Sequence, residues 1–232
     1  MNPRVYLVGT DTHVGKTTLA CALIRSARRH GTRILPFKPA ESGCCDGVDD
    51  DATRLLRAAQ DPSLTLQEIS PLRFREPIAP GLAHASEHFV EPARAPDLAP
   101  LELVTRALAQ LESRHRPDLV LIEGAGGLNV PMPGGTWQPQ WIRALSARTL
   151  VVAADRLGTI NHTLLTLSAL QTHHVCTLGF VLCQCEPRFD ASRQHNRLVL
   201  ERATNARCFG VLSHGLHDEA PWLRSLCDAT LA

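Results

Sequence analysis

The segment GTDTHVGKT, from Gly9 to Thr17, constrains this chain more than any other feature. It follows an apolar run, Val5 to Val8, and precedes an alanine- and leucine-rich stretch that begins at Thr18. A strand, then a glycine-bearing loop ending in Gly-Lys-Thr, then a helix is an order that aims backbone N–H groups and one lysine at phosphate. The order therefore predicts a site for ATP or a related nucleotide.

The loop is a longer-spaced variant of the common phosphate-binding motif. A strict G-x-x-x-x-G-K-[ST] pattern would need glycine at position 10, where Thr10 stands, and the first glycine is Gly9. The strand-like and helix-like flanks favour phosphate binding over a purely structural Gly-Lys-Thr turn. The loop residues expected to bind the nucleotide are Asp11, Thr12, His13, Val14, Gly15, Lys16, Thr17 and Thr18.

Composition narrows the class of protein. A chain of 232 residues with 44% apolar and 20% charged residues is typical of one globular α/β domain. A formal charge of +1 gives no strong attraction to nucleic acid or to an acidic membrane, so neither is expected as a partner. No apolar run approaches the about 20 residues of a membrane span, and a strand-like run follows the N-terminus at once. We expect a cytoplasmic protein.

The eight cysteines form no C-x-x-C pair and show no histidine spacing typical of zinc, so most are expected to be reduced. Three of them occur in helix- or strand-like patterns where a thiol acts as a small buried hydrophobe: Cys21, Cys176 and Cys208. Two further segments, Cys44-Cys45 and Cys183-Gln184-Cys185, are expected in loops near the site, and a reactive thiol there is an open alternative.

Apolar runs and helical patterns alternate along the chain, and the runs lack the period-2 alternation of half-exposed strands. Strands buried on both faces of a parallel sheet have this pattern. We therefore predict a doubly wound, mostly parallel α/β sheet of P-loop NTPase-like architecture. Strands are expected at 5–8, 33–37, 72–74, 119–122, 149–153, 178–182 and 208–212, and helices at 18–29, 51–59, 82–88, 101–114, 161–172 and 190–203, with residues 61–100 otherwise an irregular excursion.

In such a sheet ligands bind at the carboxyl ends of the strands. Lys38 follows the second strand, and a lysine there either meets an anion or snorkels to the surface. Glu123 follows the 119–122 strand, and its carboxylate either binds Mg²⁺ together with the hydroxyl of Thr17 or caps the glycine-rich turn. Asp51 precedes a helix, so a metal ligand and a helix cap are equally compatible with its position.

Five motifs together resemble the dethiobiotin synthetases of biotin synthesis. They are GTDTHVGKT, KPAESG, the Asp51 of DDDAT, IEGAGG and GTINHTLLTL, in the family's order and at about its spacing. The resemblance extends from Val5 to about Gly210. It implies a single ligase domain over residues 1–232, a homodimer, and ligation of CO₂ to 7,8-diaminopelargonate with ATP and Mg²⁺. The implied products are dethiobiotin, ADP and phosphate.

The implied chemistry needs cations and oxygen ligands. One substrate amine takes up CO₂ as a carbamate, whose oxygen attacks the γ-phosphorus of ATP, and the neighbouring amine then closes on the resulting carbamic-phosphoric anhydride. By resemblance, the reacting groups meet Lys16, Lys38 and Thr12, and Mg²⁺ is held by Thr17, Asp51 and Glu123. The resemblance implies that the substrate is bound by Ser42 and, across the dimer interface from the start of a helix, by Gly158, Thr159, Ile160 and Asn161.

Two positions depart from the family. His13 stands where the best-known members have a loop glutamate, so catalysis is expected to be retuned. Cys183, followed by Gln184, stands where many members have an asparagine that binds the adenine edge, and a thiol lacks the paired donor and acceptor of an amide. Adenine recognition would then need Gln184 with a shifted loop, or backbone groups near Gly210 to Leu212.

Two other classes share parts of this pattern. A nucleotide-switch ATPase of the partitioning or site-selection kind has the same fold, but usually has a second lysine early in the loop, where this chain has Thr10, Asp11 and Thr12. It also presents a basic face or a terminal amphipathic helix. An amide ligase of corrinoid synthesis has a similar N-terminal half, but needs a glutamine-hydrolysing domain for which this length leaves no room.

Overall fold

The computed structural model describes residues 2–45, 49–90, 99–215 and 220–231. Within them the main sheet has six strands in the order β10-β9-β8-β1-β5-β2, and every neighbouring pair is parallel. This confirms the doubly wound, mostly parallel α/β fold. The six strands are β1 (Arg4–Gly9), β2 (Ile34–Phe37), β5 (Leu119–Gly127), β8 (Arg148–Ala154), β9 (Thr177–Cys183) and β10 (Cys208–Leu212).

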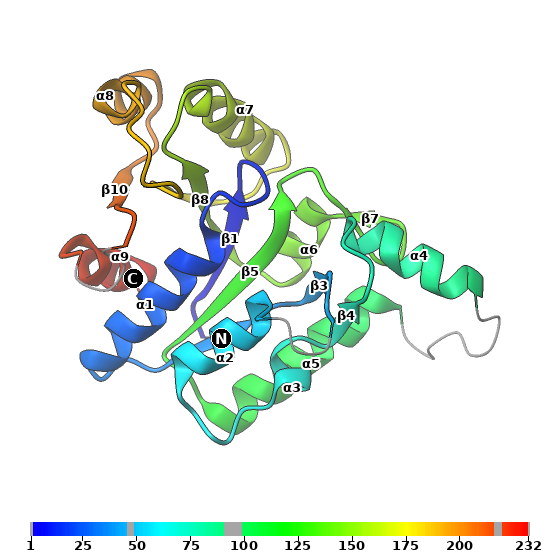
Figure 1. Cartoon of the computed structure of the whole chain (residues 1–232). Coiled ribbons are helices and arrows are strands. Elements are labelled where there is room, and N and C mark those ends of the chain that lie inside the picture. The colour runs from blue at the N-terminus through cyan, green and yellow to red at the C-terminus, as the bar shows by residue number, and fades with distance from the viewer. Residues whose placement is uncertain (1, 46–48, 91–98, 216–219, 232) are drawn as a thin grey trace.

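Helices cover the sheet on two sides (Figure 1). In front of the sheet, α1 (Lys16–Arg29) packs between α2 (Asp51–Ala59) and α9 (Trp222–Leu231). Behind it lie α5 (Pro100–His115) and α6 (Gln138–Ala144), while α7 (Thr159–Thr172) and α8 (Arg193–Ala203) pack together beyond β8. Because helices lie on both faces, side chains of either parity along a central strand are buried.

The central strand β1 shows the effect of this double cover. Val5, Tyr6, Leu7 and Val8 are each 0% exposed, although successive side chains point to opposite faces. The same continuous burial over β5 and β8 explains why the apolar runs of the sequence do not alternate with polar residues.

Several elements begin or end away from the predicted positions. The strand predicted at 119–122 continues to Gly127, because β5 stays paired with β1 as far as Gly9 opposite Gly127. Glu123 therefore lies inside a strand and does not follow one. The helices predicted from residues 18 and 161 begin earlier, at Lys16 and Thr159, and the one predicted from residue 190 begins later, at Arg193.

The excursion after α2 is more ordered than predicted. It contains α3 (Leu66–Ile69), the predicted strand β4 (Leu72–Phe74) and α4 (Pro80–Val90), while positions 91–98 lie outside the described residues. β4 pairs in parallel with β3 (Ala40–Ser42), which the sequence interpretation missed because it lies inside the KPAESG motif. Other unpredicted elements are β6 (Pro131–Met132), β7 (Thr136–Trp137), α6 and α9.

The cysteine expectations are partly confirmed. Cys21 and Cys208 are buried, but Cys176 is exposed, so its predicted burial is wrong. Cys183 is not a loop residue, since it ends β9 and the residue is 3% exposed. In the described ranges, no helix combines the length and the apolar composition that crossing a bilayer needs.

Candidate functional site

The phosphate-binding loop connects the carboxyl end of β1 to the first turn of α1. Gly15 precedes the helix with φ +95°, a left-handed conformation that glycine adopts without strain. A Cβ added there would lie 2.8 Å from Cβ of Cys183, so the loop packs closely against the end of β9. Since Lys16 and Thr17 begin the helix, its free N–H groups and dipole face the cavity above the sheet.

Lys16 is held in place by backbone oxygens. Its Nζ donates to the carbonyl oxygens of Gly126 at 2.8 Å and Asp11 at 3.2 Å. The residue is 7% exposed, and this burial lowers the pKa of the amine to about 8. A desolvated ammonium that faces the loop is well placed to bind an anion.

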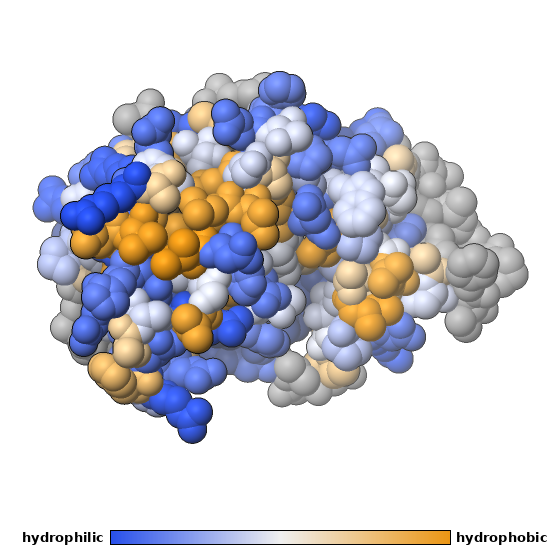
Figure 2. Space-filling model, turned by 90° about the horizontal axis from the view of Figure 1, so that it is seen from above, coloured by the Kyte–Doolittle hydropathy of each residue, from blue (hydrophilic) through white to orange (hydrophobic). Residues whose placement is uncertain are grey.

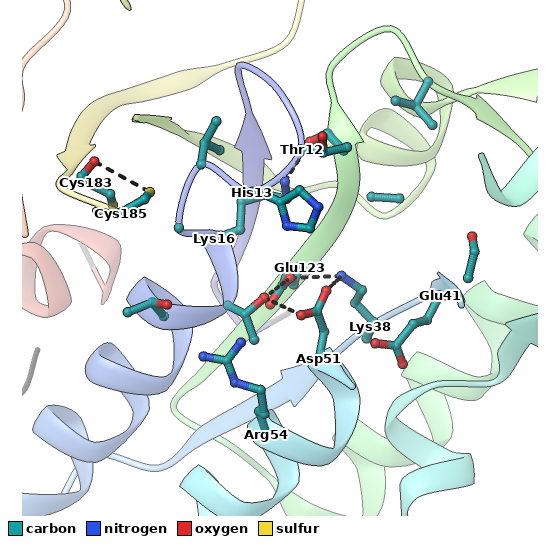
Figure 3. A pocket seen from close by; sticks show the side chains of 18 of the residues that line it. Thr12, His13, Lys16, Lys38, Glu41, Asp51, Arg54, Glu123, Cys183 and Cys185 are labelled. Carbon is teal, nitrogen blue, oxygen red and sulfur yellow. Dashed lines mark hydrogen bonds and ion pairs between the residues drawn. The ribbon is translucent and has the colours of Figure 1, made fainter. Parts of the chain in front are cut away.

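A cluster of charged and hydroxyl groups lies beside the loop (Figure 3). Lys38 donates to Asp51 Oδ2 and to Glu123 Oε1, at 2.8 Å each. The hydroxyl of Thr17 lies 2.7 Å from Asp51 Oδ1 and 2.8 Å from Glu123 Oε1. These contacts join the loop, the end of β2, the start of α2 and β5, which are far apart in the sequence.

The charges in this cluster depend on one another. Burial by itself lowers the pKa of Lys38, but the attraction of Glu123 and Asp51 is larger and raises that pKa above its usual value. Burial works against ionisation of Asp51, yet the ammonium of Lys38 holds its pKa well below the usual range. Burial raises the pKa of Glu123, because desolvation disfavours the charged carboxylate, and the negative charge of Asp51 raises it further while the ammonium of Lys38 opposes both.

The start of α2 is fixed so that Asp51 points into this cluster. The helix cap is the preceding residue, Asp50, whose side chain accepts from Thr53 N, so the carboxylate of Asp51 is not used as the cap. Arg73 of β4 binds both Asp50 and Glu41, and Glu41 accepts from the backbone N–H that follows Asp51. Through these contacts the two-stranded sheet of β3 and β4 anchors the start of α2 on both sides of Asp51.

Three oxygen ligands of the kind that Mg²⁺ prefers meet in the cluster. They are the hydroxyl of Thr17 and the carboxylates of Asp51 and Glu123. Oε2 of Glu123 is buried and has no hydrogen-bond partner among the described residues. A buried carboxylate oxygen without a partner is costly, and a divalent cation would satisfy it, so the residues present fit such an ion.

The cluster opens into a cavity of about 660 Å³, a size that suits a nucleotide together with a small substrate. The described residues that line it include most of those predicted from the sequence: Thr12, His13, Val14, Gly15, Lys16, Thr17, Thr18, Lys38, Ser42, Asp51, Glu123, Cys183 and Gln184.

Some predicted residues do not line this cavity. Asp11 is exposed, and its carboxylate accepts from Thr12 N at 2.7 Å, so it shapes the loop from outside. The segment from Gly158 to Asn161 starts α7 as predicted, with Gly158 at φ +92°, but it does not line the cavity of its own chain. The hydroxyl of Thr159 is buried there without a hydrogen-bond partner among the described residues.

The end of the cavity beside β9 lacks a free amide at the predicted position. Cys183 is buried against the loop, and burial raises the pKa of its thiol. Gln184 lines the cavity, but its Nε2 donates to Asp155 Oδ2 at 3.2 Å and its backbone N donates to Leu212 O at 2.9 Å. Leu212 itself also lines the cavity.

Sequence reasoning missed the residues that support the cluster. Glu41 lies inside the quoted KPAESG motif and lines the cavity, but β3 was not predicted, so no partner for it could be named. Arg54 also lines the cavity, and its position three residues after Asp51 was the available signal, since residues three apart share one helix face. Arg73 had no signal in the sequence.

Comparison with known proteins gives the following similarities. Residues 3–216 match the family model described as an AAA domain. The chain is 39% identical over 208 residues to the ATP-dependent dethiobiotin synthetase BioD of Anaeromyxobacter sp. (strain K), covering 90% of this chain and 88% of that protein. It is 33% identical over 228 residues to the protein of the same description from Nitrosospira multiformis, covering 98% and 96%.

Solved structures of low sequence identity share the fold. Cobyrinic acid a,c-diamide synthase from Mycobacterium smegmatis, with bound ADP and magnesium, superposes with a TM-score of 0.56 at 18% identity, covering 100% of this chain and 94% of that one. The cell division ATPase MinD from Pyrococcus furiosus gives 0.55 at 15% identity, covering 99% and 96%. Both confirm the P-loop NTPase-like architecture alone.

Proposed function

This chain belongs to the family of ATP-dependent dethiobiotin synthetases, and we propose that it ligates CO₂ to 7,8-diaminopelargonate to give dethiobiotin, ADP and phosphate. The observation that supports this best is the convergence of Lys16, Lys38, Thr17, Asp51 and Glu123 on one cavity beside a phosphate-binding loop. In this proposal the described elements form one P-loop-containing ligase domain over residues 1–232.

The loop would bind the triphosphate of ATP. The N–H groups from His13 to Thr18 and the dipole of α1 suit the phosphate oxygens, and the ammonium of Lys16 supplies positive charge at the β/γ end. Lys16 would exchange its two carbonyl acceptors for phosphate oxygens on binding. Burial at 7% exposure strengthens that attraction, because water screens it less than at the surface.

Lys38 would hold the reacting groups together. The substrate amine adds to CO₂ and loses a proton to become a carbamate, whose oxygen attacks the γ-phosphorus and displaces ADP. The second amine then closes on the anhydride carbonyl and releases phosphate. Lys38 stays charged at neutral pH beside Asp51 and Glu123, so its ammonium would neutralise carbamate and phosphoryl oxygens, and Thr12 and Ser42 would orient the substrate by hydrogen bonds.

Thr17, Asp51 and Glu123 would hold Mg²⁺. The ion would supply charge neutralisation between the phosphate groups. To test this ligand set, Mn²⁺ binding in the presence of ADP is followed by electron paramagnetic resonance in Glu123→Gln and Asp51→Asn. Each variant loses one charged oxygen ligand, so Mn²⁺ should bind each at least about tenfold more weakly. Unchanged affinity in both would mean that the ion is held elsewhere.

We propose a homodimer whose second subunit completes each site. Leu157, two residues before α7, is 79% exposed, and Leu165 on α7 is 62% exposed. Phe189, four residues before α8, is 77% exposed. In Figure 2 a large apolar area lies on the side of the molecule where Figure 1 shows α7 and α8. A two-fold contact there would bring the start of α7, at Gly158 to Asn161, toward the substrate carboxylate in the partner's cavity.

Dilution tests this arrangement. If residues of two chains complete each site, activity and substrate affinity should fall together as the dimer dissociates, at the concentration where sedimentation shows monomer. A monomer that retains full activity would contradict the shared site.

The activity itself is tested by the substrates that ATP turnover requires. Purified protein should release phosphate only when diaminopelargonate and bicarbonate are both present, with dethiobiotin detected by mass spectrometry in equal amount. Phosphate release without them, stimulated by a surface, would instead support a nucleotide-switch ATPase of the partitioning type. We place the reaction in the cytoplasm, where ATP is available and where free thiols such as the eight in this chain stay reduced.

A further inference from the structure

We propose that Arg54 is a phosphate-binding residue of the nucleotide site, whose guanidinium pairs with the phosphate oxygens that ATP and ADP have in common. The inference rests on the proposed nucleotide-binding function and adds a cation that lies outside the phosphate-binding loop. Arg54 stands on α2, whereas the loop joins β1 to α1.

Arg54 faces the same cavity as the loop. It follows Asp51 by three residues, so both project from one face of α2. The cavity is lined by Arg54 together with Thr17 and Thr18. In Figure 3 its side chain extends from α2 toward α1, on the other side of Asp51 from Lys38.

The guanidinium of Arg54 is not paired with an anionic group within the described part of the chain. Lys38 pairs there with Asp51 and Glu123, and Lys16 donates to backbone oxygens. In the same ranges the guanidinium of Arg54 has neither a hydrogen bond nor an ion pair, although the residue is half-buried. A guanidinium is always charged and has five N–H donors, so a half-buried one without a partner favours an anion in the cavity.

The charge balance of the cluster also supports a phosphate contact by Arg54. The two lysines, Lys16 and Lys38, are matched by the two carboxylates of Asp51 and Glu123, which leaves no net positive charge among these four. Phosphate would then meet only backbone dipoles and whatever charge a metal ion supplies. Arg54 adds one uncompensated positive charge, in a planar group whose geometry suits phosphate oxygens.

The position also indicates which phosphate groups are contacted. Lys38 lies beside the Gly124 carbonyl oxygen, toward the end of the site proposed for the carbamate. Arg54 lies across Asp51 from it and lines the cavity with Thr18, which is next to the loop threonine. Arg54 therefore binds the part of the phosphate chain that remains in ADP, and its contribution persists after the γ-phosphoryl group is transferred.

The helix offers a matched control. Arg57 is one turn away on α2, and its Nη1 lies 3.0 Å from Asp49 Oδ1. It borders a neighbouring depression of about 330 Å³ together with Arg54, but it does not line the nucleotide cavity. Replacing Arg57 removes the same charge from the same helix without removing the proposed contact.

The experiment measures ADP affinity by titration calorimetry in EDTA, for the wild-type chain, Arg54→Gln, Arg54→Met and Arg57→Gln. Omitting divalent metal separates a direct phosphate contact from an indirect effect on Asp51. Arg54→Gln should weaken ADP binding about tenfold, since a hydrogen bond to a charged group is lost at a partly exposed site. Arg54→Met keeps the apolar stem of the side chain and should lose a similar amount of ADP affinity. It replaces Arg54→Gln in the comparison if that variant does not fold. Arg57→Gln should stay within about twofold of wild type.

Competition with adenosine and with pyrophosphate locates the contact. Both Arg54 variants should bind pyrophosphate more weakly and adenosine as tightly as wild type. ADP affinity within about twofold of wild type in the Arg54 variants, an equal loss in Arg57→Gln, or a loss of adenosine binding equal to that of ADP would each overturn the proposal. If the wild-type chain binds no ADP, the proposed nucleotide site fails and this inference fails with it.

Discussion

Replacing Lys38 by methionine should destabilise the ligand-free protein strongly, because it leaves two carboxylates facing each other. Lys38 and Glu123 have side chains 4% and 1% exposed, and their charged atoms lie 2.8 Å apart. At that distance and an effective dielectric constant of about 20, the attraction is about 6 kcal/mol before desolvation is subtracted. Breaking a buried pair by removing one partner costs about 3–5 kcal/mol. Asp51, with its side chain 38% exposed, is screened by water and adds less.

The loss of stability should depend on pH. Burial already raises the pKa of Glu123 above its unfolded value, and removing Lys38 raises it further. A carboxyl group with a raised folded pKa stabilises the fold at low pH, and that stability is lost as the pH rises through the interval between the two pKa values. The variant Lys38→Met should therefore lie closer to wild type at pH 5 than at pH 8.

Urea unfolding followed by circular dichroism measures this effect, with a double-mutant cycle to assign it. Lys38→Met alone should lose about 3–5 kcal/mol at pH 8, and adding Glu123→Gln should recover about 2 kcal/mol or more, since no unpaired buried carboxylate remains. Mg²⁺ should also reduce the loss, because the ion would replace the missing charge. Additive effects of the two substitutions, or a pH-independent loss, would refute the coupling.

Three further outcomes are expected. Lys16→Ala should fold normally by circular dichroism but lower kcat/KM at least about a thousandfold, and near wild-type ligation would contradict its role. Cys183 offers no amide and Gln184 is hydrogen-bonded to Asp155, so kcat/KM for ATP should exceed that for GTP or CTP by only about tenfold or less. Cys183→Asn should raise this preference, whereas a thousandfold preference in the wild type would show that other groups recognise adenine. Gly15→Ala should weaken ADP binding, since its Cβ would lie 2.8 Å from Cβ of Cys183 at φ +95°, and unchanged calorimetric affinity would mean that the loop adapts.

Local patterns determined the elements that stay near the sequence expectation. Apart from the end of β5, the strands of the main sheet and the helix from Asp51 to Ala59 are found within one residue of where the apolar pattern placed them. The faces of these elements that pack against the core are apolar, so the spacing of apolar residues in the sequence reports the repeat of the helix or strand. The loop from Gly9 to Thr17 was recognisable because its chemistry requires consecutive residues.

Contacts between distant segments decided what the sequence left open. The sequence was compatible with Asp51 as a helix cap or as a metal ligand, and the structure excludes the cap. Asp50 takes that role, and Arg73, 22 positions after Asp51, anchors the helix start from another sheet. The end of β5 was misplaced because glycine residues carry no apolar signal, although the ladder with β1 continues through them.

The sequence by itself determined the fold class, the phosphate-binding loop and the residue types of the cluster, because these depend on periodicity and on consecutive residues. Only the tertiary structure decided that Lys38, Asp51 and Glu123 share one set of contacts, that Gln184 is hydrogen-bonded to Asp155 and that the start of α7 does not line the cavity of its own chain. The physical reason is that burial and pairing, which set the charge and direction of each side chain, arise from neighbours that no local pattern names.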